Sequence, residues 1–97
     1  MPEGFEAGKP ALLVFGSPHC APCVHAQRPA VSRLGQDLGD AIQTIEIDVT
    51  KSPEIAELYG VVSLPTVFVF DASGAPRRVN HGFVSTEEMR RQIEPFL

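Results

Sequence analysis

The feature that most constrains the fold of this chain is the alternation of short strand-like and longer helix-like apolar segments along its whole length. The run from Ala11 to Phe15 is almost entirely apolar, as expected for a strand that is covered on both faces. Segments in the order β-α-β-α-β-β-α are typical of an α/β domain in which helices flank a mixed sheet. We therefore predict one such domain over residues 1–97, with the 11–15 strand at its centre.

The longest helix is predicted from Ala21 to about Leu38. Apolar residues fall near helical spacing along it: Val24, Ala30, Val31, Leu34 and Leu38. Pro29 lies inside this segment, where proline removes one backbone hydrogen bond and crowds the preceding turn. A kink is therefore expected near residues 25–29.

Turn residues and alternating apolar residues place the other elements. In chain order, these are an edge strand at 42–49, a short helix through 59, a strand at 66–70, a strand at about 77–81 and a last helix after 85. Ser52 is expected to cap the short helix, and Ser85 with Glu88 forms a capping box for the last one. Because proline is tolerated only in an edge strand or at the start of a strand, Pro76 predicts that the fourth strand lies at a sheet edge or begins there.

Composition excludes several classes of function. The net charge is −4, and the paired arginines at 77–78 and 90–91 form no basic stripe, so a nucleic-acid partner is not expected. The first residues show no charged segment followed by an apolar leader, which predicts a cytoplasmic protein without a membrane partner. In a reducing compartment, two closely spaced cysteines indicate a catalytic or transient disulfide.

Cys20-Ala21-Pro22-Cys23 lies where the first strand leads into the long helix. Free N–H groups and the dipole at a helix N-terminus stabilise an anion, and the thiolate is the reactive form of cysteine. Cys20 is therefore predicted to be the nucleophile and Cys23 the resolving thiol in reversible disulfide exchange. Pro22 is expected to stiffen the loop, while Ala21 contributes little beyond its small size.

His19 precedes the first cysteine, and a protonated imidazole there would further stabilise the Cys20 thiolate. The alternative is that His19 is simply an exposed loop residue. His25 and His81 are more typical of surface or structural positions.

Four features in order make the chain resemble the thioredoxin family: the apolar strand before Cys20, an isoleucine-rich strand ending at Asp48, the Leu64-Pro65-Thr66 segment, and Gly82 before the last helix. The resemblance covers about residues 11–97. It implies a protein-disulfide reductase without a cofactor, served by a thioredoxin-reductase-like electron donor. It also implies a cis peptide bond at Pro65, with Leu64 and Pro65 lining a groove for an extended substrate peptide.

The chain departs from the family pattern at several positions. Where the family usually has Trp-Cys-Gly-Pro-Cys, this chain has His-Cys-Ala-Pro-Cys at residues 19–23. Val14 takes the position of the family's buried aspartate, and Thr44 that of its lysine neighbour on the next strand. The short N-terminal segment predicts a trimmed fold with four strands in spatial order 2-1-3-4. The 42–49 strand would then expose an edge, which predicts either a weak homodimer or coverage by the N-terminal segment of a monomer.

Two rival interpretations remain open. Cys20 and Cys23 with His19 or His25 could contribute to a zinc site, although the tight loop and the lack of a second cysteine pair argue against a metal. The chain could also be a thioredoxin-like interaction module whose cysteines turn over slowly. The direction of exchange is open between reductase, oxidase and isomerase, and the expected location favours reduction.

Overall fold

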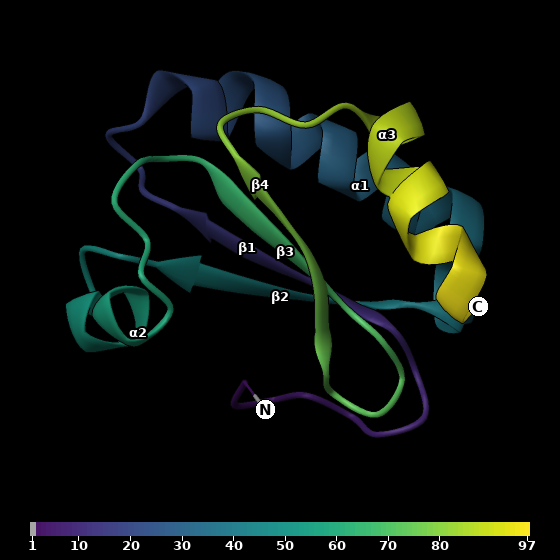
Figure 1. Ribbon diagram of the computed structural model, residues 1–97. Coiled ribbons are helices and arrows are strands. Elements are labelled where there is room, and N and C mark those ends of the chain that lie inside the picture. Colours follow the sequence, from purple (N-terminus) through teal and green to yellow (C-terminus); the bar gives the residue numbers. More distant parts are fainter. Residues whose placement is uncertain (1) are drawn as a thin grey trace.

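The computed structural model describes residues 2–97, which form a four-stranded mixed sheet (Figure 1). In spatial order the strands are β2 (Gln43–Asp48), β1 (Ala11–Gly16), β3 (Thr66–Phe70) and β4 (Pro76–His81). β1 pairs with β2 in parallel and with β3 antiparallel, and β3 pairs with β4 antiparallel. The predicted fold class and strand order 2-1-3-4 are confirmed, with the 11–15 strand inside the sheet.

Helices cover both faces of this sheet. Figure 1 shows α1 (Arg28–Leu38) and α3 (Thr86–Ile93) together on one face, while α2 (Pro53–Leu58) lies on the other side. Short 3₁₀ turns follow α1 at Gly39–Ala41 and α3 at Glu94–Phe96. None of the helices within residues 2–97 is long and apolar enough to cross a membrane.

β1 contributes to two hydrophobic cores, one on each face of the sheet. Leu12 and Val14 pack in the core beneath α1 and α3. Leu13 and Phe15 pack in the second core, beside α2. Because successive side chains of a strand point to opposite faces, a strand covered on both sides must be apolar at every position.

The kink predicted near residues 25–29 takes the form of a π turn at Cys23–Gln27, directly before α1. The N–H of Arg28 donates to the carbonyl of Cys23, five residues earlier, instead of four as in an α-helix. Pro29 follows this π turn inside one continuous helical stretch, so the N–H that it lacks is one that a regular helix would pair with the preceding turn. The irregular part of the helix therefore begins at Cys23, and Pro29 lies just after it, in α1.

Two predicted helix caps form only in part. Ser52 occupies the N-cap position of α2, but its side chain makes no capping hydrogen bond. At α3, Ser85 Oγ accepts the N–H of Glu88 at 3.1 Å, as predicted. The Glu88 carboxylate turns toward Arg91 instead of completing the reciprocal bond of a capping box.

The N-terminal segment is tied to the start of β2 through the side chain of Gln43. Gln43 Oε1 accepts the N–H of Glu6 at 2.7 Å, and Gln43 Nε2 donates to the carbonyls of Glu6 at 2.6 Å and Lys9 at 3.0 Å. Farther along β2, Thr44 and Glu46 are exposed. Self-association through this edge stays a prediction.

Asp71 organises the turn between β3 and β4 through its carboxylate. Oδ1 accepts from Ser73 Oγ at 2.6 Å, from Ser73 N at 2.9 Å and from Ala75 N at 3.1 Å. Oδ2 accepts from Arg77 Nε at 2.7 Å. These donors, the Ser73 hydroxyl first among them, hold the pKa of Asp71 far below its usual value.

Replacing this carboxylate tests its contribution to the turn. Since the folded pKa is depressed, the ionised form stabilises the fold above the ordinary aspartate pKa, and this contribution is lost as pH falls toward the folded pKa. Asp71→Asn is therefore expected to lower the melting temperature at pH 7. The difference in melting temperature between the variant and the parent should become smaller below about pH 4. Thermal unfolding between pH 2.5 and 7 measures this, with the exposed Asp40→Asn as control. A difference that does not change with pH would refute it.

Candidate active site

Cys20 and Cys23 are joined by a disulfide between the end of β1 and the π turn. Their Cα atoms lie 5.2 Å apart. The N–H of Cys20 donates to the carbonyl of Ser17 at 3.2 Å, and the carbonyl of Cys20 accepts the N–H of Val24 at 3.1 Å. Cys20 therefore opens the first helical turn, with Ala21 and Pro22 exposed beside it.

The two sulfurs differ in their surroundings. Cys20 is partly buried, whereas the side chain of Cys23 is packed inward and the residue is 7% exposed. The N–H of Cys23 points at Cys20 Sγ at 3.2 Å. Once the disulfide is reduced, this N–H and the helix N-terminus favour negative charge on Cys20 over Cys23.

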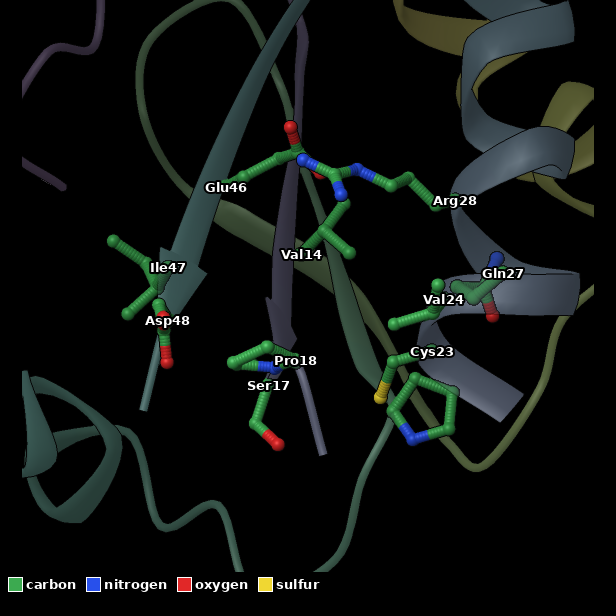
Figure 2. Close-up of a pocket in the computed structure, with 12 residues that line it drawn as sticks. Val14, Ser17, Pro18, Cys23, Val24, Gln27, Arg28, Glu46, Ile47 and Asp48 are labelled. Carbon is green, nitrogen blue, oxygen red and sulfur yellow. The ribbon is translucent and has the colours of Figure 1, made fainter. Parts of the chain in front are cut away.

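A cavity of about 170 Å³ lies beside Cys23. Figure 2 shows the Cys23 sulfur directed into it, with Val14 on its wall and the side chains of Arg28 and Glu46 meeting near Val14. Arg28 Nε and Glu46 Oε1 are 3.4 Å apart. A space of this size admits water to the inner sulfur.

Gly16, the last residue of β1, leaves room for the second cysteine. A Cβ at this position would lie 3.3 Å from Cys23 Cβ and 3.4 Å from Cys23 Sγ. Such contacts are tighter than usual, so a side chain here would push against the inner sulfur. Gly16 was not among the predicted site residues, although a glycine that ends an apolar strand just before the cysteines is a visible signal.

The Leu64–Pro65 peptide bond is cis, and Pro65 lines the same cavity as Cys23. Thr66 Oγ1 donates to the carbonyl of Ser63 at 2.8 Å, and Gly82 N–H donates to the carbonyl of Pro65 at 2.8 Å. Leu64 packs instead against the core beside α2. The structure thus places Pro65 at the cavity of Cys23, whereas Leu64 packs against the second core.

Comparisons with known proteins agree with this geometry. A sequence model described as thioredoxin matches residues 5–95. The chain belongs to the thioredoxin family. A thioredoxin of Bacillus subtilis is 33% identical over 86 residues, which cover 89% of this chain and 81% of the relative.

Other thioredoxins differ from the chain in length or are more distant. Chloroplastic thioredoxin M4 of Arabidopsis thaliana is 34% identical over 94 residues, which are 95% of this chain and 47% of the relative. The chain spans about half the length of the chloroplastic relatives it matches, 47% of one and 54% of another. A solved thioredoxin-2 of a malaria parasite superposes with a TM-score of 0.84 at 23% identity, covering 90% of this chain and 82% of that one, and so shares the fold.

The departures from the thioredoxin pattern are visible at the cavity. Val14 is 7% exposed and makes the wall apolar where the family has a buried acid, and Thr44 is exposed on the edge strand. The carboxylates that line the cavity come from β2 instead: Glu46, the register partner of Val14, and Asp48. Hydrogen bonds from the Thr50 hydroxyl and N–H lower the pKa of Asp48, with smaller contributions from the charge of Lys51 and then of His19.

Histidines lie at the surface of this thioredoxin domain. His19 is exposed, and its N–H donates to Ser17 Oγ at 3.1 Å. His25 and His81 are exposed as well. Within residues 2–97, no three histidine, cysteine, aspartate or glutamate side chains are grouped so as to hold a metal ion.

Gln27 is a site residue that was not predicted from the sequence. It is fully buried, lines the cavity with Cys23, and bonds the backbone of Val84. The available signal was its spacing, because position 27 precedes Val31 by four residues and Leu34 by seven. A polar residue on the apolar stripe of a helix needs a buried partner.

Proposed function

We propose that this chain is a thiol-disulfide oxidoreductase that reduces protein disulfides through the Cys20–Cys23 couple. The observation that carries the proposal is the asymmetry of the pair: the Cys23 N–H faces Cys20 Sγ, and Cys20 is the less buried of the two residues. Membership of the thioredoxin family supports the same chemistry.

The reaction begins with the Cys20 thiolate. It attacks one sulfur of the substrate disulfide, so a bond from Cys20 to substrate forms while the substrate disulfide breaks and releases a thiolate. Cys23 then loses its proton to water in the cavity and attacks Cys20 Sγ. This step forms the Cys20–Cys23 disulfide and releases the second substrate thiolate. Two electrons have moved to the substrate, and its two thiolates take up protons from solvent.

Reduction is the proposed direction, with a cytoplasmic or other reducing compartment as the location. A thioredoxin-reductase-like donor would return two electrons to the Cys20–Cys23 disulfide after each turnover. We place the substrate peptide in extended form beside Pro65, where strand-like backbone pairing suits the segment that precedes β3.

Insulin reduction in the presence of dithiothreitol tests the proposal. We expect the chain to accelerate precipitation of the insulin B chain well beyond the rate with dithiothreitol alone. A rate equal to that of dithiothreitol would instead favour a slow interaction module, for which the apolar wall at Val14 is the specific supporting observation.

His19 has a smaller predicted effect on the same thiolate. His19→Ala is expected to raise the pKa of Cys20 in the reduced protein, by up to about one unit, because a nearby positive charge is removed. The exposure of His19 limits the effect through solvent screening. Alkylation rates of Cys20 measured against pH report this pKa, and a curve identical to that of the parent would show that His19 is only a loop residue.

A further inference from the structure

The resolving step needs a group that takes the proton of Cys23. The thiol form of cysteine predominates at neutral pH, and burial disfavours the thiolate further. Cys23 is 7% exposed, and the side chain of Val14 on the wall of its cavity has no atom that accepts a proton. Attack of Cys23 on Cys20 is therefore slow unless a base lies within reach of the cavity, directly or through one water.

Two carboxylates of β2 line this cavity, those of Glu46 and Asp48. They lie on the same face of the sheet as their register partners in β1, Val14 and Gly16. Gly16 lies against the second cysteine, since a Cβ there would be 3.3 Å from Cys23 Cβ. Ordinary sheet spacing puts the Glu46 backbone roughly 8 Å from that of Gly16, a gap that a glutamate side chain and one water span.

The two carboxylates differ in the groups that they bond. Asp48 Oδ1 accepts the Thr50 hydroxyl at 2.6 Å and the Thr50 N–H at 2.9 Å. These bonds lower the pKa of Asp48, which makes it a weak proton acceptor. Glu46 Oε1 lies 3.4 Å from Arg28 Nε, longer than a usual N–H···O bond. Glu46 is therefore the better placed of the two to accept a proton from water in the cavity.

The π turn brings Arg28 to the same cavity. Its N–H donates to the carbonyl of Cys23, so residue 28 lies one turn above residue 23. Figure 2 shows the Arg28 and Glu46 side chains meeting near Val14. These two side chains are 66% and 52% exposed, and ion pairs so exposed add little to stability. The guanidinium would instead hold the carboxylate at the cavity and remain positive beside a thiolate that forms on Cys23.

We propose that Glu46 takes the proton of Cys23, through water in the cavity, while Cys23 attacks the mixed disulfide, and that Arg28 holds the carboxylate in place. This inference rests on the proposed oxidoreductase function. The S–H bond of Cys23 breaks, and its proton passes through water to a carboxylate oxygen of Glu46. The freed electron pair forms the bond to Cys20 Sγ, and the bond between Cys20 and substrate breaks with its pair on the substrate sulfur. Glu46 then releases the proton to solvent.

The coloured disulfide dithiobis(nitrobenzoate), mixed with an excess of reduced protein, separates the two steps. One nitrothiobenzoate is released when Cys20 attacks, at a rate that depends on protein concentration. The second is released when Cys23 resolves the mixed disulfide, at a rate that does not. Glu46→Gln is expected to slow the second phase about tenfold at pH 7, a modest loss because solvent replaces part of the lost base. The first phase should change less than about twofold.

Glu57→Gln is the matched control, because it removes the same charge from an exposed position on α2. Both phases of this variant should equal those of the parent. Glu46→Gln should fold like the parent, since its side chain lies at the surface of an edge strand. Thermal unfolding of the three proteins checks that a slower second phase does not come from a damaged fold.

The pH dependence separates proton transfer from a structural or purely electrostatic role. Besides Cys23, the charged or titratable groups that line the hollows around Glu46 are Arg28 and Asp48. Above about pH 9, hydroxide ionises Cys23 without a base, so the second phases of Glu46→Gln and the parent should become equal. If Glu46 acted only through its charge, its removal would favour the Cys23 thiolate and speed the second phase.

The inference is overturned if the second phase of Glu46→Gln at pH 7 is as fast as that of the parent, or faster. It is also overturned if the loss is the same at every pH, which would indicate a structural effect. A parent that shows no second phase would contradict the resolving role of Cys23, and with it the oxidoreductase function itself.

Discussion

Replacing Cys20 by serine is expected to lower the rate of protein-disulfide reduction roughly a thousand-fold or more, since the proposed mechanism assigns the attacking sulfur to this residue. A serine hydroxyl does not ionise near neutral pH and cannot form an exchangeable disulfide. The N–H of Cys23 and the helix N-terminus would remain in place, but they would have no thiolate to stabilise. Stopped-flow or turbidity assays of insulin reduction measure the loss.

Cys23→Ser is the paired variant for this prediction. Its Cys20 thiol is intact, so the first step should proceed and leave substrate bound through a mixed disulfide, while turnover stops. Equal rates for the parent and Cys20→Ser would contradict the assigned nucleophile. Fast turnover by Cys23→Ser would contradict the assigned resolving thiol.

Phe15→Ala is expected to lower the free energy of unfolding by about 3–5 kcal/mol, because it leaves a cavity that the surrounding structure cannot fill. Phe15 is 0% exposed. Its ring centroid lies 5.6 Å from that of Tyr59 and 5.8 Å from that of Phe68. Since a small domain is stable by only about 5–15 kcal/mol, this loss should bring the protein close to unfolding at 37 °C. Urea denaturation followed by circular dichroism measures it.

Phe83→Ala provides the matched control for the stability prediction. It removes the same side chain from a position that is 54% exposed, so the unfolding free energy should change by no more than about 0.5 kcal/mol. Similar losses for the two variants would show that the aromatic cluster around Phe15 does not dominate the second core.

The strand order 2-1-3-4 was implied by the family resemblance, and the apolar pattern agrees with it, since β1 and β3 are apolar at nearly every position, while β2 alternates and β4 begins at Pro76. The π turn did not follow from sequence. Pro29 indicated an irregular helix, but nothing in the sequence indicated that the irregularity is a π turn at Cys23–Gln27, or that its last residue bonds Val84. That partner, Val84, lies 57 positions away in the chain.

The candidate site divides in the same way. The spacing of Cys20 and Cys23 predicts their redox chemistry from the local sequence alone. The family resemblance added the prediction that Pro65 lies at the site. The roles of Gly16 and Gln27 depend on tertiary contacts, one a close approach to Cys23 and the other a buried bond to a distant loop. Spacing along one helix or strand does not encode such contacts, although each residue breaks the local pattern in a recognisable way.

Trapping a substrate on the Cys23→Ser variant tests the central claim most directly. The variant, incubated with an oxidised protein substrate, alkylated and digested, is expected to yield one mixed disulfide that mass spectrometry maps to Cys20. A substrate adduct that forms equally well when Cys20 is replaced by serine and Cys23 is intact would contradict the claim that Cys20 is the poised thiolate.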